Sequence, residues 1–191
     1  MLEQNFQGIS EFNYGLNGPL DFENQNGVIP ILKLHGSINW NDKGAVYKNF
    51  TELRKSGESP LIIPPTWNKS FGDLSSVWNN AITALKSARN IIIMGFSMPP
   101  TDVHFKYLAA TGLGENIFLR NIIFVNPGLN DETADNTDSL KTNLYNIFRK
   151  DIGGTTIKFE KKTIREFFTN CDCLQRIERL KSYQLYGLRK Y

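Results

Sequence analysis

The sequence predicts an α/β fold, in which helices cover both faces of a mostly parallel sheet. Two observations carry this prediction. Short apolar runs rich in β-branched residues alternate with longer stretches whose apolar residues recur every three or four positions. In addition, 191 residues with 40% hydrophobic composition suffice for one globular domain and are few for two. The repeated order of strand and helix is typical of right-handed parallel connections.

The chain begins with 29 residues that are rich in Asn, Gly and Gln and have no sustained period, so we expect a loop there. An apolar run at residues 31–34 predicts the first strand. Residues 41–44 favour a turn that leads into a hairpin partner at residues 45–49. A further strand is expected at residues 61–63, because the two prolines that follow cannot donate to a sheet ladder.

The first long helix is expected after these prolines. Ser70 or Asp73 is a suitable N-cap for it. Its apolar residues are spaced as packing against a sheet requires. They are Leu74, Val77, Trp78, Ala81, Leu85 and Ala88.

Residues 91–94 form a continuous apolar run typical of a central parallel strand that is buried on both faces. A second helix is expected to follow, with Thr101 or Asp102 as its N-cap. The side chains expected on its inner face are Val103, Tyr107 and Leu108.

Two more strands, at residues 122–125 and 155–159, complete the predicted sheet, with a helix at residues 139–149 between them. The last stretch of the chain, after residue 160, is expected to be helical. We therefore divide the chain into an α/β domain over residues 1–160 and a helical tail over residues 161–191, which would dock on the domain or on a partner.

Composition excludes several classes of function. Lys and Arg outnumber Asp and Glu by 22 to 19, and a net charge of +3 does not indicate a nucleic-acid partner. No run of 18 apolar residues is present, so we expect no membrane span and a cytoplasmic location. The only cysteines, Cys171 and Cys173, do not have the spacing of a zinc site, and no metal is expected.

Three of the predicted strands end in small or polar residues, and ligands of open α/β sheets bind at the carboxyl ends of the strands. Glycines there let backbone N–H groups approach a phosphate, while an amide side chain can satisfy a ribose diol. We therefore expect a nucleotide crevice, with tight turns as the alternative role of the glycines. Neither GxGxxG nor GxxxxGK[ST] occurs. The candidate residues are His35, Gly36 and Ser37; Gly95, Phe96 and Ser97, with Asp102 close behind; and Asn126.

Several motifs follow one another along the chain, and their order is informative. They are ILKLHGSINW at residues 31–40; IIPPT at residues 62–66, followed by Lys69 and Trp78; and IIMGFS at residues 92–97, followed by Pro99 and Asp102. Over roughly residues 28–130 the chain thereby resembles the sirtuin-like domain of bacterial proteins, many of which act in antiphage defence. The resemblance implies that His35 is the catalytic histidine. It also implies that Gly95 and Ser97 contact the dinucleotide and that Asn126 contacts the adenosine ribose.

The sequence departs from that family in two respects. Sirtuins have a Gly-Ala-Gly-type strand and helix, then a strand end with Asn or Asp, before these motifs, and this chain has neither. It therefore resembles the C-terminal half to two thirds of the domain, as a partial Rossmann-like sheet. It also lacks the four-cysteine module of protein-deacylating sirtuins, so no zinc is expected and hydrolytic or sensing members are the closer analogues.

The resemblance implies cleavage of the N-glycosidic bond between nicotinamide and ribose in NAD, with NAD as substrate and His35 as general base. Our leading hypothesis is an NAD-hydrolysing domain of antiphage defence, active as an NAD glycohydrolase once the missing half is supplied. A non-catalytic sensor of NAD or ADP-ribose, an interaction subunit and, less favoured, a protein deacylase are the alternatives. Expected partners are NAD or a related nucleotide, and a second copy or another chain that supplies the missing half.

Some of these residues have a purely structural alternative. His35 could be a structural histidine, although its surrounding motif favours catalysis. Asp102 serves equally well as a helix N-cap or as part of the nucleotide pocket. His104 has no metal-ligating partner at a suitable spacing, so we expect it to pack or to lie at the surface. The tryptophans are expected in the core or in a pocket wall: Trp40, Trp67 and Trp78.

Overall fold

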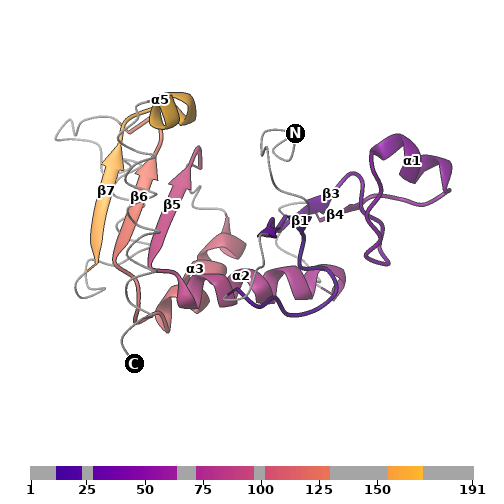
Figure 1. Cartoon of the computed structure of the whole chain (residues 1–191), viewed down its shortest axis with the longest axis horizontal. Helices are drawn as coiled ribbons and strands as arrows, with labels where there is room; N and C mark the ends of the chain where they lie inside the picture. The colour runs from indigo at the N-terminus through magenta and orange to yellow at the C-terminus, as the bar shows by residue number, and fades with distance from the viewer. Residues whose placement is uncertain (1–11, 23–27, 64–71, 97–101, 130–154, 170–191) are drawn as a thin grey trace. The chain divides into compact units, whose positions relative to one another are not determined.

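The computed structural model describes residues 12–22, 28–63, 72–96, 102–129 and 155–169 (Figure 1). The chain divides into two compact units. The first unit comprises Met1–Ala88 and Thr101–Ile117, and the second comprises Arg89–Pro100 and Phe118–Tyr191. Each unit contains both helices and strands.

The first unit contains two pairs of very short strands. Strand β1 (Phe12–Asn13) pairs in parallel with β2 (Ile29–Pro30). Strand β3 (Gly36–Ser37) pairs antiparallel with β4 (Leu61–Ile62), which lies where a strand was predicted.

The strand predicted at residues 31–34 is wrong, because these residues connect β2 to β3 without entering a ladder. The chain turns there, and the N–H of Gly36 donates to the carbonyl of Lys33 over 2.9 Å. Leu32 and Leu34 nevertheless pack against the buried cluster of this unit. Their side chains account for the apolar run, which alone does not distinguish a strand from a packed connection.

The predicted turn after Trp40 is present, but it leads to a single antiparallel bridge with Val46 rather than to a strand. The N–H of Asn41 donates to the carbonyl of Ala45 over 3.0 Å and closes the turn. A helix that was not predicted follows, α1 (Phe50–Lys55). Its N-cap is Asn49, whose Oδ1 accepts from the N–H of Glu52 over 3.0 Å.

Two longer helices form the rest of this unit. A 3-10 turn (Gly72–Leu74) leads into α2 (Ser75–Ser87), whose N-cap position is Leu74, without a side-chain hydrogen bond. The expected cap at Asp73 is therefore wrong, and Ser70 lies outside the described residues. Helix α3 (Val103–Gly114) begins as predicted at Asp102.

The buried face of α3 differs from the expected one. Leu108 is buried, as predicted, but Val103 is 39% exposed and Tyr107 is 57% exposed. The inner face instead runs through Leu108, Ala109, Gly112 and Leu113. Small residues on this face allow α3 to lie close to α2.

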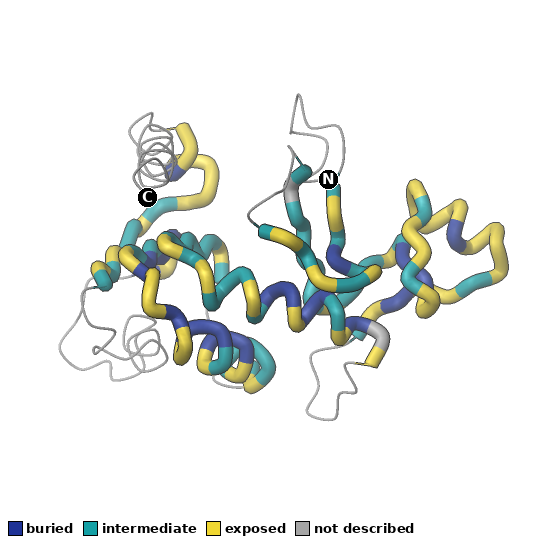
Figure 2. Tube along the Cα trace, turned by 60° about the horizontal axis from the view of Figure 1, so that its bottom comes forward, coloured by how far each residue is buried: buried dark blue, intermediate teal, exposed yellow. Residues whose placement is uncertain are grey.

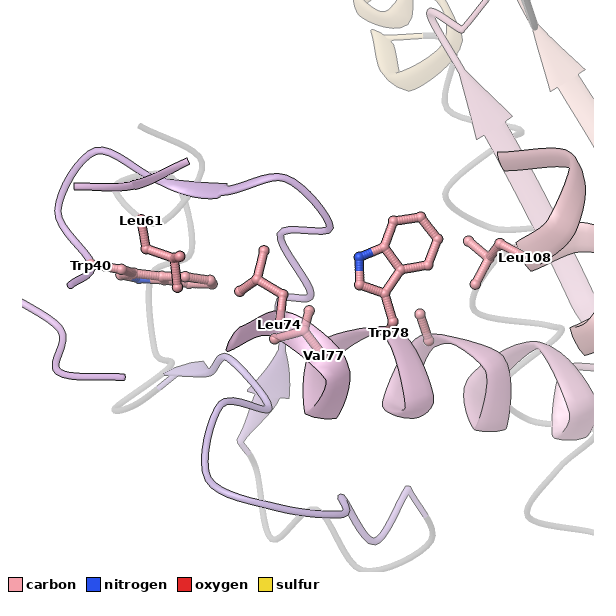
Figure 3. Close-up of a cluster of buried hydrophobic side chains, with 7 residues drawn as sticks. Trp40, Leu61, Leu74, Val77, Trp78 and Leu108 are labelled. Carbon is pink, nitrogen blue, oxygen red and sulfur yellow. The ribbon is translucent and has the colours of Figure 1, made fainter. Parts of the chain in front are cut away.

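The buried cluster of the first unit joins these helices to the short strands (Figure 3). Trp40 is fully buried, and Trp78 donates its Nε1–H to the carbonyl of Leu34 over 2.9 Å. Both tryptophans thus belong to the core, as expected, while Trp67 lies outside the described residues. The members of the cluster are Trp40, Leu61, Leu74, Val77, Trp78, Ala81 and Leu108.

The second unit holds a three-stranded parallel sheet in the order β5-β6-β7 (Figure 1). Its strands are β5 (Asn90–Met94), β6 (Asn121–Val125) and β7 (Thr156–Glu160). The predicted strands are therefore present. Within the described sheet, however, β6 rather than β5 is central, and the residues of β5 are only partly buried. The expectation of a fully covered central strand is wrong for β5.

One short helix covers part of this sheet. In α5 (Ile164–Thr169), Phe167 is buried and forms an apolar cluster with Val125. Figure 2 shows the chain trace coloured by the burial of each residue. The helix lies at the start of the predicted tail, while residues 170–191 and the helix predicted at residues 139–149 fall outside the described residues. Of the helices that the structure describes, none has the length and hydropathy to cross a bilayer.

Candidate functional site

The predicted site residues are distributed over both units. His35, Gly36, Ser37 and Asp102 belong to the first unit. The remaining described candidates, Gly95, Phe96 and Asn126, belong to the second. Ser97 lies outside the described residues. The structure therefore establishes the geometry of each group within its own unit.

The exposed ring of His35 is oriented by Ile63, the residue that follows β4. Its Nδ1 lies 3.1 Å from the carbonyl oxygen of Ile63, and the N–H of Ile63 donates to the carbonyl of His35 over 2.9 Å. Because a carbonyl oxygen can only accept, Nδ1 carries the hydrogen, and the neutral ring has its lone pair at Nε2. This is the tautomer that a general base acting through Nε2 requires.

The two residues after His35 have polar groups that serve the loop itself. Gly36 adopts a positive φ of 79° and donates its N–H to Lys33. The hydroxyl of Ser37 donates to Oδ1 of Asn39 over 2.6 Å and accepts from the ammonium of Lys33 over 3.4 Å. In this conformation a ligand would meet a side-chain hydroxyl next to a cation, rather than an available N–H of Gly36.

Asp102 and His104 take structural positions at the start of α3. Oδ1 of Asp102 accepts from the N–H of Phe105 over 3.0 Å, which is an N-cap hydrogen bond. The ring of His104 lies edge-on to that of Trp78, with 6.3 Å between centroids. The packing role expected for His104 is confirmed.

The second group lies at one edge of the parallel sheet. Gly95 follows β5 and Asn126 follows β6, so both lie just beyond the carboxyl ends of neighbouring strands, at the edge to which the arrowheads point in Figure 1. Nδ2 of Asn126 lies 3.5 Å from the carbonyl oxygen of Phe96, which links the two loops. The structure thus brings together Gly95, Phe96 and Asn126, as the strand order predicted.

Most of the backbone donors at this edge have partners. The N–H of Gly95, at a φ of 67°, donates to Val125 over 3.0 Å, and the N–H of Gly128 donates to Oδ1 of Asn126 over 2.8 Å. A phosphate would therefore not find the N–H of Gly95 available in this conformation. By contrast, the Nδ2 contact of Asn126 is at the outer limit of a hydrogen bond, so exchanging it for a hydrogen bond to a ligand would cost little, while Oδ1 keeps its bond to Gly128.

Helix α5 borders the same edge. A β-carbon built on Gly95 would lie 3.3 Å from Cδ1 of Ile164, the first residue of α5. The N-terminal turn of α5 is closed by a capping box in which Thr163 and Glu166 exchange hydrogen bonds. Glycine is therefore favoured at this position by its positive φ, and a larger residue would also require the end of the Ile164 side chain to shift slightly.

Comparison of the chain with protein-family models, with curated proteins and with solved structures finds no match. The chemistry of the site thus rests on its own residues. Over the described ranges, no three His, Cys, Asp or Glu side chains are grouped so as to hold a metal ion, and the two cysteines lie outside those ranges.

Sequence reasoning did not single out Ile63, although its carbonyl oxygen orients His35. No pattern of side chains could have indicated it, because the contact uses a backbone atom. The capping box was also missed, and here a signal existed: Thr163 and Glu166 have the T-x-x-E spacing of a helix start.

Proposed function

We propose that this chain forms part of a sirtuin-like NAD-hydrolysing site of the kind used in antiphage defence, on a partial Rossmann-like sheet. The observation that carries the proposal is the position of Gly95 and Asn126, which directly follow two adjacent parallel strands at their carboxyl ends. That edge is where open α/β sheets bind nucleotides, because successive strands end there side by side.

Asn126 supplies the recognition chemistry of this edge. Its Oδ1 is held by the N–H of Gly128, which sets the orientation of the planar amide, while Nδ2 makes only a long contact. An amide donor in a fixed orientation suits a ribose hydroxyl, which accepts and donates hydrogen bonds. The role that the resemblance implies for Asn126 is therefore compatible with its contacts.

His35 would supply the base for the chemical step. In NAD cleavage nicotinamide leaves with the electron pair of the glycosidic bond, and charge develops on the ribose. A base at Nε2 of His35 can take a proton from a ribose hydroxyl or from the attacking water. The carbonyl of Ile63, 3.1 Å from Nδ1, then stabilises the positive ring that results.

A non-catalytic sensor of ADP-ribose is the second candidate, and one observation favours it. The N–H of Gly95 is already committed to the sheet, and the N–H of Gly128 to Asn126. An edge with its backbone donors so committed can bind a ribose while offering little stabilisation to a pyrophosphate. In either case, we expect phosphate contacts from a second copy or from another chain that carries the glycine-rich segment.

The first experiment is calorimetric titration of ADP-ribose into the full 191-residue chain. Asn126→Ala should weaken binding about 3- to 10-fold, the value of one hydrogen bond. Asn121→Ala is the matched control, because Asn121 lies at the amino end of the same strand, where its Nδ2 donates to Asn90 over 2.7 Å. Asn126→Asp keeps an acceptor for Gly128 and removes the amide donor, which separates recognition from loop folding.

No ADP-ribose binding at millimolar concentration, or equal weakening by Asn126→Ala and Asn121→Ala, would overturn the proposal of a nucleotide site. Measuring nicotinamide release from NAD then separates the two candidates. Release that depends on His35 supports the hydrolase, whereas binding without release under every condition, including addition of a chain with the glycine-rich segment, supports the sensor.

A further inference from the structure

A pocket lies wholly within the first unit, beside the bridge between Trp40 and Val46. Its volume is about 620 Å³, which is within the range of about 300–1,000 Å³ found for small-molecule sites. Among the lining residues that the structure describes, Ser37 alone belongs to the predicted nucleotide site. The inference drawn from this pocket does not depend on the proposed function.

A lysine that lines the pocket places its ammonium over two aromatic rings. The ammonium of Lys33 lies 5.0 Å from the ring centroid of Tyr14 and 5.5 Å from that of Trp40. These two rings contact each other edge-on at 5.2 Å, and Trp40 is fully buried. Cation–π contacts of this kind fix the position of the charge.

The charge of the lining is of one sign. Lys33 and Lys48 both line the pocket, and neither Asp nor Glu is among the lining residues that the structure describes. Two ammonium groups around one concave surface raise the local concentration of anions. The pocket therefore favours a negatively charged ligand.

A polar wall is held in place by hydrogen bonds. Oδ1 of Asn39 accepts from the hydroxyl of Ser37, and its Nδ2 donates to the carbonyl of Tyr47, each over 2.6 Å. Tyr47 in turn donates its N–H to the carbonyl of Asn39 over 2.8 Å. Because these contacts tie together both sides of the turn, the wall is formed before a ligand arrives, which lowers the entropic cost of binding.

Apolar side chains also line the pocket. Ile38, Val46 and Phe50 are 57%, 45% and 42% exposed. Exposed apolar side chains beside positive charge suit a ligand with a flat apolar body and a charged end.

We propose that this pocket binds an organic anion with an aromatic body, such as an aromatic carboxylate or an aryl phosphate. Lys33 and Lys48 supply the positive charge for its anionic group. The exposed side chains of Ile38, Val46 and Phe50 cover its aromatic body. A carboxylate and a phosphate would both be recognised by the positive charge of the lysines, and the experiment below distinguishes between them.

The test uses three probes with the same ring system: naphthalene-2-carboxylate, 2-naphthyl phosphate and the neutral naphthalene-2-methanol. Each is titrated into the full chain by calorimetry. We expect at least one anion to bind about tenfold more tightly than the alcohol, and its affinity to fall as salt is added. The ratio of the two anions identifies the preferred group.

Substitutions of the two lysines test whether their charges bind the anion. Lys48→Met should weaken binding of the preferred anion about threefold or more, and Lys33→Met about tenfold, with little effect on the alcohol. Lys106→Met is the matched control, because Lys106 is a lysine of α3 that does not line the pocket. Lys33→Arg keeps the charge over the rings and should retain binding, which guards against misfolding of Lys33→Met.

Equal affinity for the alcohol and both anions would overturn the proposal, as would no anion binding at millimolar concentration. A loss in Lys106→Met equal to that in Lys48→Met would also overturn it. Asn126→Ala should leave naphthalene-2-carboxylate binding unchanged. A failure of the proposed anion pocket is therefore distinguishable from a failure of the proposed nucleotide site, because binding to the nucleotide site is measured with ADP-ribose.

Discussion

A β-carbon on Gly36 would lie 2.1 Å from the carbonyl oxygen of Leu61 on the neighbouring strand. That distance is far inside van der Waals contact, and Gly36 also has a positive φ of 79°. Strands β3 and β4 can therefore pair only if this position is glycine. The pairing places His35 next to Ile63, so the glycine that follows the histidine is required by the fold whatever ligand is bound.

Gly36→Ala should lower the free energy of unfolding by about 3 kcal/mol or more, because the added carbon forces the strands apart. Gly57→Ala is the control, since Gly57 has the same φ of 79° but no atom within 4 Å of its added carbon. We expect it to cost about 1 kcal/mol from backbone strain alone. Urea unfolding curves give both values, and similar losses would show that the contact with Leu61 is unimportant.

Gly112 is required by packing between two helices rather than by backbone conformation. A β-carbon there would lie 2.5 Å from Cβ of Leu85 on α2. Gly112→Ala should therefore destabilise the first unit by about 1–3 kcal/mol. Gly114→Ala, in the same helix with open space around it, should be neutral or stabilising by up to about 1 kcal/mol. Thermal unfolding that ranked the two variants in the reverse order would contradict this packing.

His35→Ala should lower the rate of NAD cleavage about 10²-fold in a preparation that releases nicotinamide, the usual effect of losing a general base. His104→Ala should change the rate little, because His104 packs on Trp78. Circular dichroism of both variants checks folding. Equal losses in two folded variants would mean that His35 is not the base.

The 191-residue chain by itself should release nicotinamide slowly. It contains no glycine-rich motif for a pyrophosphate, and the N–H of Gly95 is engaged with Val125. Without preorganised donors for the phosphates, several kcal/mol of transition-state stabilisation, on the order of 3–4, should be missing. Rapid release by the purified chain would contradict this expectation and would call for another source of phosphate contacts.

The pKa of Glu166 lies below its usual value of 4.5, chiefly because its carboxylate accepts a hydrogen bond from the backbone N–H of Thr163, with the Thr163 hydroxyl and Lys162 adding to the effect. A lowered pKa means that the stabilisation is present above 4.5 and is lost as the pH falls through the folded-state value. The amide resonance of Thr163 should titrate with a midpoint below 4.5. Glu166→Gln should remove the titration and keep the capping box. A midpoint at or above 4.5 would show that the carboxylate does not accept these bonds.

Much of the second unit could be predicted from the sequence, because β5 and β6 hold apolar runs of strand length and β7 alternates polar with apolar residues. Their order along the chain also predicted that Gly95 and Asn126 would lie at one edge. The position of β5 at the side of the described sheet could not be predicted, because Ile91, Ile92 and Ile93 are as apolar as a central strand.

The first unit was harder to predict for a physical reason. Its strands are only two residues long, so no period of alternation exists to be detected. The pocket combines residues from four separate places, among them Tyr14, Lys33, Asn39 and Phe50. Only the folded loops bring such residues together, whereas the stripe of apolar residues that predicted α2 is local in sequence.

The first unit is assembled from two separate lengths of chain, because residues 89–100 of the second unit intervene between α2 and α3. During synthesis on the ribosome, α2 is made before α3, which contributes Leu108 to the same cluster. Trp78 and Ala81 of α2 therefore remain uncovered until α3 has been synthesised. A protein cut once anywhere between β5 and α3 would leave neither piece with a closed core. The two units therefore complete their folding together during biosynthesis and lose their structure together on proteolysis, whatever each binds.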